Sequence, residues 1–551
     1  MITNPILPGF NPDPCICKKD DNYYIAVSTF EWLPGIPIYH SKDLKNWELI
    51  THVLDDTIVD LKKLPSAKGI WAPDLSYCET EKKFYIVYGV MNNMNARYFD
   101  IDNYIMTADD IMGPWSNPVY IHSAGFDASI FHDDNGRKYI VSLDWETRDN
   151  YEKPGVINIV EYDANNQAII GYPKRFWKGA TDRGCIEAPR LTKHGKYYYI
   201  MCAEGGTGYN HSVTMGRSEN VWGPYEPDPI GAIVTSQPQK SNERADYDHL
   251  KPKYYNPDSE LQKSGHGSYV NLDDDEAYLV HLTARPFVVD EADDRSRYRC
   301  TLGRETAIQK MIWTKDGWLR MADGSNLAKV NVEEPKLAEY PVKSVPTYDD
   351  FDSEELGIYY YSPRISANRF CDLKSKEGFL RIRGGEALTS LNSVSLLCRK
   401  LTSVNAIVTT KVHFEAETFQ HSAGLVIYYD NMNYSYLRIY YSETLNSSAI
   451  MLQQMENGNR KQWLDERTAI DSSRDIFMKL KIEGREIHFE WSYDGKIWNI
   501  IGPKLDISMY SDEYCKYGEF TGTMVGMACI DRLNHSKCAE FDFFEYKDIN
   551  N

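Results

Sequence analysis

Short apolar runs, rich in tyrosine and isoleucine, alternate with polar turns over residues 1 to about 320. Typical runs are Tyr23-Tyr24-Ile25 and Tyr197-Tyr198-Tyr199-Ile200, and the breaks between them carry Asp-Asn, Asn-Gly or Gly-Pro pairs. Runs of this length and composition are typical of β-strands, and such pairs are typical of turns. Because helical spacing is sparse throughout the chain, the pattern predicts an all-β fold.

The apolar runs belong to a unit that recurs five times. Each unit opens on a lead residue, and a tyrosine-rich run follows roughly ten residues later. The five lead residues are Asp13 in NPDP, Asp74 in WAPD, Asp127 in GFDAS, Glu187 in IEAPR and His266 in GHGSYV. Strand-rich units of roughly 50–80 residues are a sequence sign of propeller blades, so the pattern predicts a five-bladed β-propeller.

The lead residues are candidates for one shared site. In a propeller the innermost strand of each blade starts near the central axis, so we expect the leads to converge at one mouth of the channel. A single Asp beside a Pro can equally cap a turn. Three carboxylates at matching positions, Asp13, Asp127 and Glu187, favour a site instead, since acid–base chemistry on a sugar needs carboxyl groups brought together.

The pattern changes after residue 321. Residues 322–347 are rich in Pro and Glu, have no period and predict a linker. Alternating stretches beyond it, such as 406–410 and 436–440, predict long antiparallel strands. We therefore expect a propeller over 1–321, the linker over 322–347 and a β-sandwich over 348–551.

Composition narrows the class of ligand. The net charge of −19 argues against binding to nucleic acid or to anionic membranes, so we expect a small neutral or cationic ligand. Most of the 40 Tyr and 12 Trp residues are expected to be strand formers. A minority suits a carbohydrate site, where flat rings stack on the C–H faces of a sugar.

Cysteine usage and the N-terminus indicate the compartment. The 11 cysteines are scattered, without C-x-x-C pairs and without zinc spacing, which predicts free thiols. The first residues, MITNPILPGFNPDP, lack the basic and long apolar parts of a signal peptide. No segment reaches the ~18 apolar residues of a membrane span. We therefore expect a reduced, cytoplasmic protein.

Seven motifs occur in order along the chain: NPDP, STFEWLPG, WAPD, GFDAS, IEAPR, AEGGT and LGRETAIQK. Together they resemble glycoside hydrolase family 43, in particular its two-domain β-xylosidases, over the whole chain. The resemblance implies a five-bladed propeller, a concanavalin-like sandwich and hydrolysis with inversion. Asp13 then matches the general base and Glu187 the general acid. Asp127 matches a third carboxylate, which raises the pKa of the acid by like-charge repulsion and helps to hold it.

The resemblance also implies residues that bind the substrate. Arg304 in LGRET matches an arginine that hydrogen-bonds sugar hydroxyls, although an interblade salt bridge is the alternative. Phe30 and Trp71 match apolar walls of the first sugar subsite, and Trp145 is expected to border the entrance. Without the resemblance, Phe30 and Trp71 would each be assigned to the core.

Two further residues complete the implied site. His266 matches a histidine on the central axis, which either hydrogen-bonds the arginine or, as in some relatives, ligates calcium. We expect no required cofactor and assign no metal ligand. Phe520 in YGEFTG matches a loop that related β-xylosidases extend over the propeller mouth. The sandwich would then close one end of the cleft, so that only the end of a sugar chain enters.

The sequence therefore predicts an exo-acting β-xylosidase that releases xylose from short β-1,4-xylo-oligosaccharides, and the resemblance suggests a homo-oligomer, often a tetramer. The nearest alternative is an α-L-arabinofuranosidase or a bifunctional enzyme. A non-catalytic carbohydrate-binding protein and a scaffold for partner proteins are the others, and the three carboxylates argue against both. Insertions at 92–102 and 236–260 match no pattern and are candidates to border the mouth.

Overall fold

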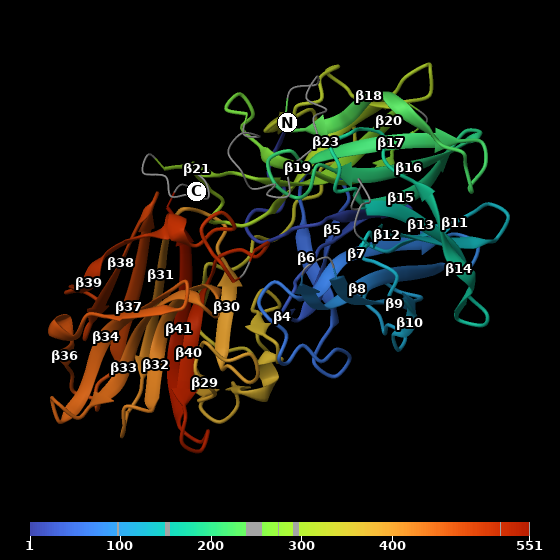
Figure 1. Cartoon of the computed structure of the whole chain (residues 1–551). Helices are drawn as coiled ribbons and strands as arrows, with labels where there is room; N and C mark the ends of the chain where they lie inside the picture. The colour runs from blue at the N-terminus through green and yellow to red at the C-terminus, as the bar shows by residue number, and fades with distance from the viewer. Residues whose placement is uncertain are drawn as a thin grey trace.

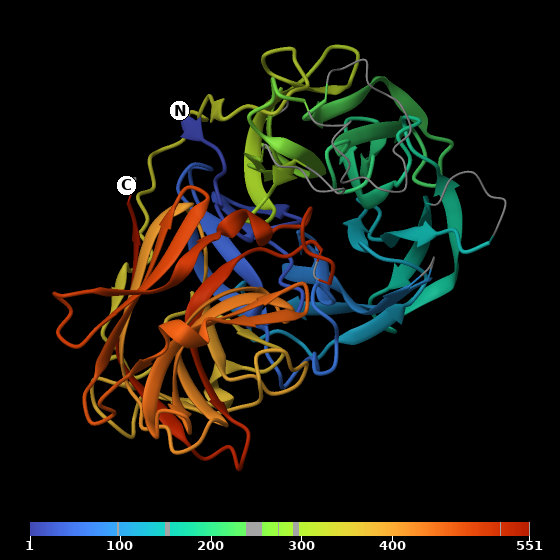
Figure 2. The ribbon, with the colours of Figure 1, turned by 60° about the vertical axis from the view of Figure 1, so that its left-hand side comes forward.

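The computed structural model describes every residue except 96–97, 149–154, 238–255, 274, 290–296, 518 and 550–551. It contains two β-rich bodies side by side, a ring of blades and a sandwich (Figures 1 and 2). The described residues contain no α-helix, and their helical segments are the short 3-10 turns η2 (Ala367–Arg369), η3 (Leu464–Glu466) and η4 (Ile507–Met509). The all-β prediction is confirmed.

Five four-stranded antiparallel sheets form the blades. Blade 1 contains β2 (Cys15–Lys19), β3 (Asn22–Ala26), β5 (Gly35–Ser41) and β6 (Glu48–Leu54). Blade 2 contains β7 (Gly69–Cys78), β8 (Lys83–Asn95), β9 (Tyr98–Ala108) and β10 (Val119–His122). Blade 3 contains β11 (Ser129–His132), β12 (Lys138–Trp145), β13 (Gly155–Asp163) and β14 (Ala168–Trp177). Blade 4 contains β15 (Glu187–His194), β16 (Tyr197–Glu204), β17 (Ser212–Ser218) and β18 (Glu226–Thr235). Blade 5 contains β19 (Gln262–Asn271), β20 (Glu276–Ala284), β23 (Glu305–Trp313) and β24 (Leu319–Met321), and β21 (Phe287–Val288) pairs with β22 (Tyr298–Arg299) beside it.

The first strands of the blades close the ring. β2 packs against β7, β7 against β11, β11 against β15, β15 against β19, and β19 packs back against β2. The two ends of the ring are joined as well, because β1 (Ile2–Thr3) pairs with β25 (Asn331–Val332). The stretch predicted as a linker therefore contains a strand that is tied to the N-terminus. The prediction of five blades is confirmed.

Three lead residues share an unusual backbone conformation at the start of their blades. Asp13, Asp127 and His266 have φ angles of 56°, 54° and 51°. These values lie in the left-handed region, which few residues other than glycine adopt. By this conformation the three residues mark one position of the repeat, which lies just before β2 and β11 and falls within β19.

In the other two blades the left-handed residue is an alanine. Ala72 and Ala188 have φ angles of 36° and 50°. Glu187 therefore precedes the equivalent position by one residue, and Asp74 follows it by two. Irregular pairing of β7 with β8 and of β15 with β16 accompanies this shift. The predicted common register is wrong for Asp74 and Glu187, because residue types in the sequence do not show where a strand bulges.

Two sheets form the second body. One sheet contains, in spatial order, β28 (Cys371–Asp372), β29 (Leu380–Arg383), β41 (Cys538–Asp548), β31 (Asn405–His413), β37 (Ile476–Glu483), β38 (Glu486–Ser492) and β39 (Asn499–Asp506), with β26 (Tyr348–Asp349) beside β41. The other contains β30 (Leu396–Lys400), β40 (Met524–Asp531), β32 (His421–Asp430), β33 (Asn433–Ser442), β34 (Ser447–Glu456) and β35 (Asn459–Gln462), with β36 (Thr468–Ala469) beside β34. Apolar residues of both sheets, such as Phe541 and Leu425, are fully buried in one core cluster.

The two bodies share a strand pair and a core. β4 (Trp32–Leu33), from the STFEWLPG segment, pairs with β27 (Ser362–Pro363). Trp32 is fully buried, and its ring meets that of Tyr428 edge-on at a centroid distance of 5.7 Å. Phe30 and Phe520 belong to the same cluster of buried residues. The interface between the bodies is therefore continuous with two predicted site residues.

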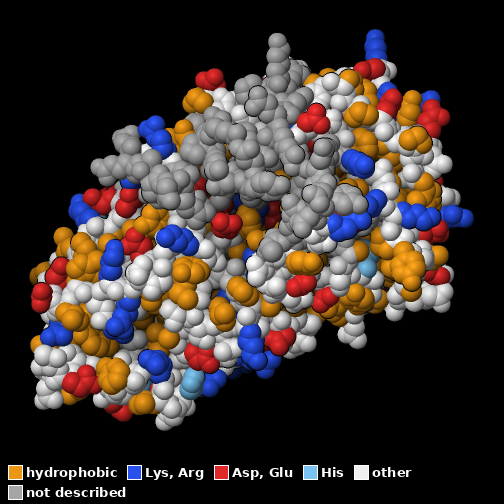
Figure 3. Space-filling view, viewed as in Figure 1, with side chains coloured by type: hydrophobic (Ala, Val, Ile, Leu, Met, Phe, Trp, Pro, Cys, Tyr) orange, Lys and Arg blue, Asp and Glu red, His pale blue; other side chains and the backbone are white. Residues whose placement is uncertain are grey.

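The surface shows no concentration of one charge on the face seen in Figure 3, where the described basic and acidic side chains are interspersed. All 11 cysteines are free, which confirms the predicted thiols. Within the described part of the chain, no helix has the length and apolar character needed to cross a bilayer.

Candidate active site

Asp13, at the turn into β2, has several polar partners. Its Oδ2 accepts a hydrogen bond from the Ser28 hydroxyl at 2.7 Å. Arg304 Nη1 donates to its Oδ1 at 3.3 Å, and His266 Nδ1 lies 3.6 Å from the same oxygen. A guanidinium and a hydroxyl are partners that stabilise a carboxylate in its charged form. Asp13 is therefore equipped to act as a base.

Glu187, the first residue of β15, has the opposite environment. Its Oε1 lies 3.6 Å from His211 Nε2, and 16% of its side chain remains exposed. Burial, and then the negative charges of Asp127 and Asp13, raise the pKa of Glu187 well above its ordinary value. A carboxyl group with a raised pKa keeps its proton at a pH where an ordinary glutamate has lost it, which is what a general acid requires.

His211 faces Glu187 in its neutral form. Its Nδ1 lies 3.0 Å from the backbone oxygen of Lys263, and because a carbonyl oxygen only accepts, the ring proton is assigned to Nδ1. Burial lowers the pKa of His211 to about 3, so Nε2 carries no proton at neutral pH. Nε2 thus presents a lone pair to Glu187, and a lone pair on that side favours the protonated carboxyl group.

Asp127 supports the backbone beside Glu187. Its Oδ2 accepts a hydrogen bond from the N–H of Ala188, the next residue along the chain, at 3.0 Å. Burial, and then the charge of Asp13, raise the pKa of Asp127 to about 7. Since Asp13 and Asp127 both raise the pKa of Glu187, the structure brings the three predicted carboxyl groups into one electrostatic unit.

Arg304 connects this unit to the second domain. Its Nη1 also donates to Thr207 Oγ1 at 2.8 Å, and its Nη2 donates to the backbone oxygen of Phe520 at 3.1 Å. The guanidinium carbon lies 5.6 Å from the ring centroid of Phe30 and 5.3 Å from that of Phe520, within reach of cation–π attraction. The alternative prediction, an interblade salt bridge, accounts only for the contact between Arg304 and Asp13. Arg304 lies inside the cluster of candidate residues.

Aromatic rings from both domains line the same region. The Trp71 ring meets those of Phe30, Phe126 and Phe520 at centroid distances of 5.9, 5.8 and 6.3 Å, each close to perpendicular. Its indole N–H donates to the backbone oxygen of Ala67 at 3.0 Å, which fixes the plane of the ring. Phe30, Trp71 and Phe520 therefore lie together, in an arrangement that suits the C–H faces of a sugar.

Trp145 lies further along this row of rings. It is the last residue of β12, and its ring centroid is 6.4 Å from that of Phe126 and 5.1 Å from that of Phe99. Phe99, which also stacks on Phe126, belongs to the first of the two unexplained insertions. Residues 96–97 and 238–255 of those insertions lie outside the described residues.

Asp74, the lead residue of blade 2, joins the blades to one another. Its Oδ1 lies 3.2 Å from Arg190 Nε, and its Oδ2 accepts a hydrogen bond from the N–H of Ile130 at 3.0 Å. Arg190 also donates to the backbone oxygen of Gly267 at 3.2 Å. Asp74 is therefore a structural residue that holds blades 2 to 5 together.

His266 is buried beside Asp13. Burial, and then the positive charges of Arg190 and Arg304, lower the pKa of His266 well below its usual value. The ring is therefore neutral, and its Nδ1 is directed toward Asp13. The expectation that no metal is required at His266 stays a prediction.

The two parts of the chain match two family models. Residues 2–319 match the model of glycosyl hydrolases family 43, and residues 348–547 match the beta-xylosidase C-terminal concanavalin A-like domain. The chain belongs to glycosyl hydrolases family 43. The resemblance seen in the motifs is thereby confirmed, together with the concanavalin-like form of the sandwich. The clustered carboxyl groups of Asp13, Asp127 and Glu187 lie within the part of the chain that matches the glycosyl hydrolase model.

Members of family 43 match this chain over both domains. The beta-xylosidase of Bacillus subtilis is 38% identical over 553 residues, which cover 99% of each chain. The xylosidase/arabinosidase 43B of Humicola insolens is 36% identical over 556 residues, which cover 100% of this chain and 98% of that one. Among solved structures, the xylan beta-1,4-xylosidase of Bacillus halodurans is 41% identical with a TM-score of 0.92, and the match covers 99% of this chain and 100% of that one.

Several residues of this family 43 site had no role in the sequence analysis. Thr207 is the last residue of the AEGGT motif, and His211 follows it by four positions in the same loop between β16 and β17, so that motif is the signal that could have pointed to them. Phe126 precedes the lead residue Asp127 by one position. Ser28 follows β3 and is the first residue of the STFEWLPG motif, so that motif is the signal that could have pointed to it.

Proposed function

We propose that this family 43 enzyme is an exo-acting β-xylosidase, which releases xylose from the non-reducing end of short β-1,4-xylo-oligosaccharides with inversion of configuration. The names of the Bacillus subtilis and Bacillus halodurans relatives support this substrate. Because the matches extend over the sandwich, they include the segment that carries Phe520. The proposal therefore rests on relatives that share both domains.

The observation that carries the proposal is the contrast between Asp13 and Glu187. Asp13 has Arg304 and Ser28 as partners for a negative charge. Glu187 has a raised pKa and faces the lone pair of His211. Inverting hydrolysis needs this pair, a charged base for water and a neutral acid for the leaving oxygen. We therefore assign Asp13 as the base and Glu187 as the acid.

In the proposed reaction, water attacks the anomeric carbon while Asp13 takes a proton from it. As the glycosidic bond breaks, Glu187 gives its proton to the oxygen of the departing sugar. Asp13 ends protonated and Glu187 ends charged, so Asp13 must lose one proton to solvent and Glu187 must gain one from it before the next turnover. Asp127 holds the backbone next to the acid and, when charged, raises the pKa of the acid further.

The proposed exo action follows from Phe520. This residue of the sandwich domain packs against Trp71 and receives a hydrogen bond from Arg304. A wall supplied by the second domain blocks one side of the sugar that lies against Trp71. The terminal sugar of an oligosaccharide then fits beside Trp71, whereas an internal sugar would fit only if Phe520 did not block this side.

An α-L-arabinofuranosidase, or an enzyme with both activities, is the second candidate. The Humicola insolens relative is named as a xylosidase/arabinosidase. The two pentosides can present similar bonds to the same pair of carboxyl groups, so one site can serve both.

Values of kcat/KM on xylobiose, 4-nitrophenyl β-D-xyloside and 4-nitrophenyl α-L-arabinofuranoside test the proposal. We expect xylobiose to be hydrolysed and the xyloside to be preferred over the arabinofuranoside. Turnover of the arabinofuranoside alone would favour the second candidate. Binding of xylobiose without turnover of any substrate would contradict both and favour a carbohydrate-binding protein. The Asp13→Asn variant, purified in parallel, controls for contaminating glycosidases.

We further propose that the protein is cytoplasmic, that it forms a homo-oligomer, with a tetramer as one candidate size, and that its reaction needs no metal. Size-exclusion chromatography with light scattering measures the assembly. Activity after treatment with EDTA tests the metal: unchanged kcat supports metal-free action, and a loss that calcium restores would contradict it.

A further inference from the structure

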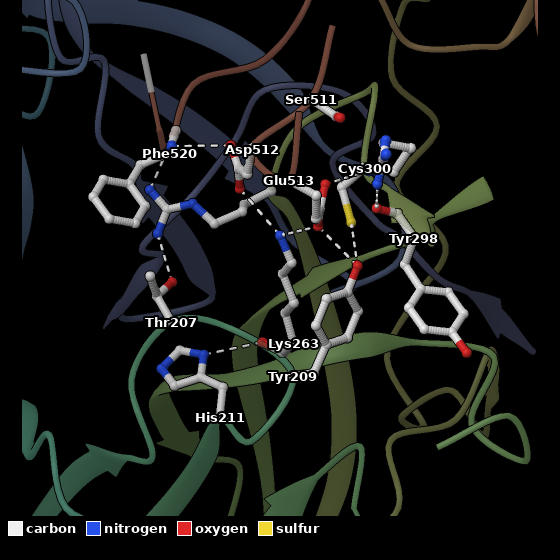
Figure 4. A network of polar contacts seen from close by, with 12 residues as sticks. Thr207, Tyr209, His211, Lys263, Tyr298, Cys300, Ser511, Asp512, Glu513 and Phe520 are labelled. Atoms are coloured by element: carbon white, nitrogen blue, oxygen red, sulfur yellow. Dashed lines mark hydrogen bonds and ion pairs between the residues drawn. The ribbon is translucent and has the colours of Figure 1, made fainter. Parts of the chain in front are cut away.

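A buried cluster of three charges lies where the propeller meets the sandwich (Figure 4). Lys263 of β19 places its Nζ 3.1 Å from Asp512 Oδ2 and 2.7 Å from Glu513 Oε1. The two carboxylates belong to the segment between η4 and β40, so the ion pairs cross the domain interface. None of the three side chains is more than 1% exposed.

The carboxylate oxygens of the cluster have further partners. Glu513 Oε1 accepts a hydrogen bond from the Tyr209 hydroxyl at 2.8 Å, and Oε2 accepts one from the N–H of Cys300 at 2.9 Å. Asp512 Oδ1 accepts from the Tyr429 hydroxyl at 2.6 Å. Burial opposes the charged form of Glu513. Lys263, together with the hydrogen bonds from Cys300 and Tyr209, nevertheless holds the pKa of Glu513 down to about 2. Buried ions are costly to desolvate, so stability alone is a weak reason for such a cluster.

One chain of contacts runs from Asp512 to the candidate base. Asp512 Oδ1 also accepts a hydrogen bond from the N–H of Phe520 at 2.9 Å, where φ is 77°. The backbone oxygen of Phe520 accepts from Arg304 Nη2 at 3.1 Å. Arg304 in turn donates to Asp13 at 3.3 Å. Asp512 thus fixes both the ring wall and the guanidinium that faces the base.

A second chain of contacts runs from Lys263 to the candidate acid. Lys263 has a left-handed backbone with φ 53°, a conformation that is strained for lysine and needs support from its surroundings. Its carbonyl oxygen accepts from His211 Nδ1 at 3.0 Å, and His211 Nε2 lies 3.6 Å from Glu187. The ion pairs to Asp512 and Glu513 anchor the side chain of this same residue (Figure 4).

We propose that Asp512 and Glu513 of the sandwich domain are positioning residues for the active site. By holding Lys263, they fix His211 beside Glu187, and Asp512 also holds Phe520 beside Arg304 through the N–H of Phe520. Together they set the geometry around both carboxyl groups of the reaction. The second domain is then a working part of the active site as well as a wall. This inference rests on the roles proposed above for Asp13 and Glu187.

Charge-neutralising variants test the inference in the full-length enzyme. Glu513→Gln and Asp512→Asn remove one carboxylate charge each and keep the side-chain shape. Tyr429→Phe, which removes only a hydroxyl donor to Asp512, is the milder variant if the others fold poorly. The matched control is Arg369→Ala, because Arg369 forms an interface ion pair with Asp56 at 2.9 Å that connects to none of the residues above.

We expect Glu513→Gln and Asp512→Asn to lower kcat on xylobiose by at least tenfold. The alkaline limb of the pH profile should move to lower pH, because His211 would no longer present its lone pair to Glu187. Tyr429→Phe should give a smaller shift in the same direction, and Arg369→Ala should keep both the rate and the profile. Variants that lose thermal stability but keep the kcat, the KM and the pH limbs of the parent would overturn the inference.

Crystal structures of the variants give a readout that does not depend on activity. We expect the Phe520 carbonyl to move out of hydrogen-bonding distance of Arg304, and the His211 ring to turn away from Glu187. Both groups in unchanged positions would overturn the inference even if the rate falls. An inactive parent enzyme would refute the proposed function, and the displacement would still decide whether the cluster positions these groups.

Discussion

Arg304 of the propeller donates a hydrogen bond to the backbone oxygen of Phe520 in the sandwich domain, at a distance of 3.1 Å. The same guanidinium contacts Asp13 and Thr207. The groups around the candidate base therefore come from both domains, and the interface core that contains Phe30 and Phe520 holds them together.

Substitution of Glu187 by Gln removes the proton donor and keeps the shape of the side chain. We expect kcat on xylobiose to fall ~10²–10⁴-fold, the usual worth of general acid catalysis. The loss should be much smaller on 4-nitrophenyl β-D-xyloside, because nitrophenolate leaves with little need of a proton. Steady-state kinetics on both substrates measure this, and equal losses would contradict the role of Glu187 as the acid.

Substitution of Asp13 by Asn removes the base. We expect losses of ~10²–10⁴-fold that are similar on xylobiose and on the nitrophenyl substrate, since both need an activated water. Asp74→Asn is the matched control, because Asp74 is a lead residue that pairs with Arg190. It should lower the melting temperature more than the turnover. Near-normal turnover by Asp13→Asn would refute the assignment.

The alkaline limb of the pH profile of kcat/KM reports the proton on Glu187. Burial and the charges of Asp127 and Asp13 raise the pKa of Glu187, so this limb should lie well above the range of an ordinary glutamate. Asp127→Asn removes one negative charge, and the limb should then move to lower pH while the effect of burial remains. A limb that stays in place, or moves to higher pH, would contradict the electrostatic role of Asp127.

Asp127 also makes the stability of the protein depend on pH. Its pKa is about 7 in the folded protein and ~3.9 in the unfolded chain. Between these values the folded state binds more protons, so its stability falls as the pH rises from about 4 to about 7. Asp127→Asn should remove this loss and raise the melting temperature at pH 8 relative to the parent. Calorimetry at pH 4 and pH 8 measures the difference, and an equal effect at both pH values would count against it.

The blades were predictable because each is built from consecutive strands with turn residues between them. The three carboxyl groups were predictable as well, since two of them share a repeat position and the motifs identify the third. The register of the lead residues could not be predicted, because Ala72 and Ala188 take the left-handed position that Asp13 and Asp127 fill in their own blades. A one-residue shift at a bulge leaves no trace in the pattern of apolar residues.

The contacts between the domains could not be predicted from the sequence, for a different reason. Lys263 and Asp512 are separated by 249 positions, and neither lies in a recurring motif. Burial of a charge depends on what the fold brings next to it, and composition cannot show this. The placement of Phe520 came from the family resemblance, whereas its tie to Arg304 came from the structure.

A proton NMR time course of xylobiose hydrolysis tests the central claim most directly, that Asp13 and Glu187 act as base and acid on opposite sides of a β-xylosidic bond. The account predicts that α-xylose appears first and that β-xylose follows only as mutarotation proceeds. Early β-xylose would mean retention through a covalent intermediate and would contradict the assigned roles.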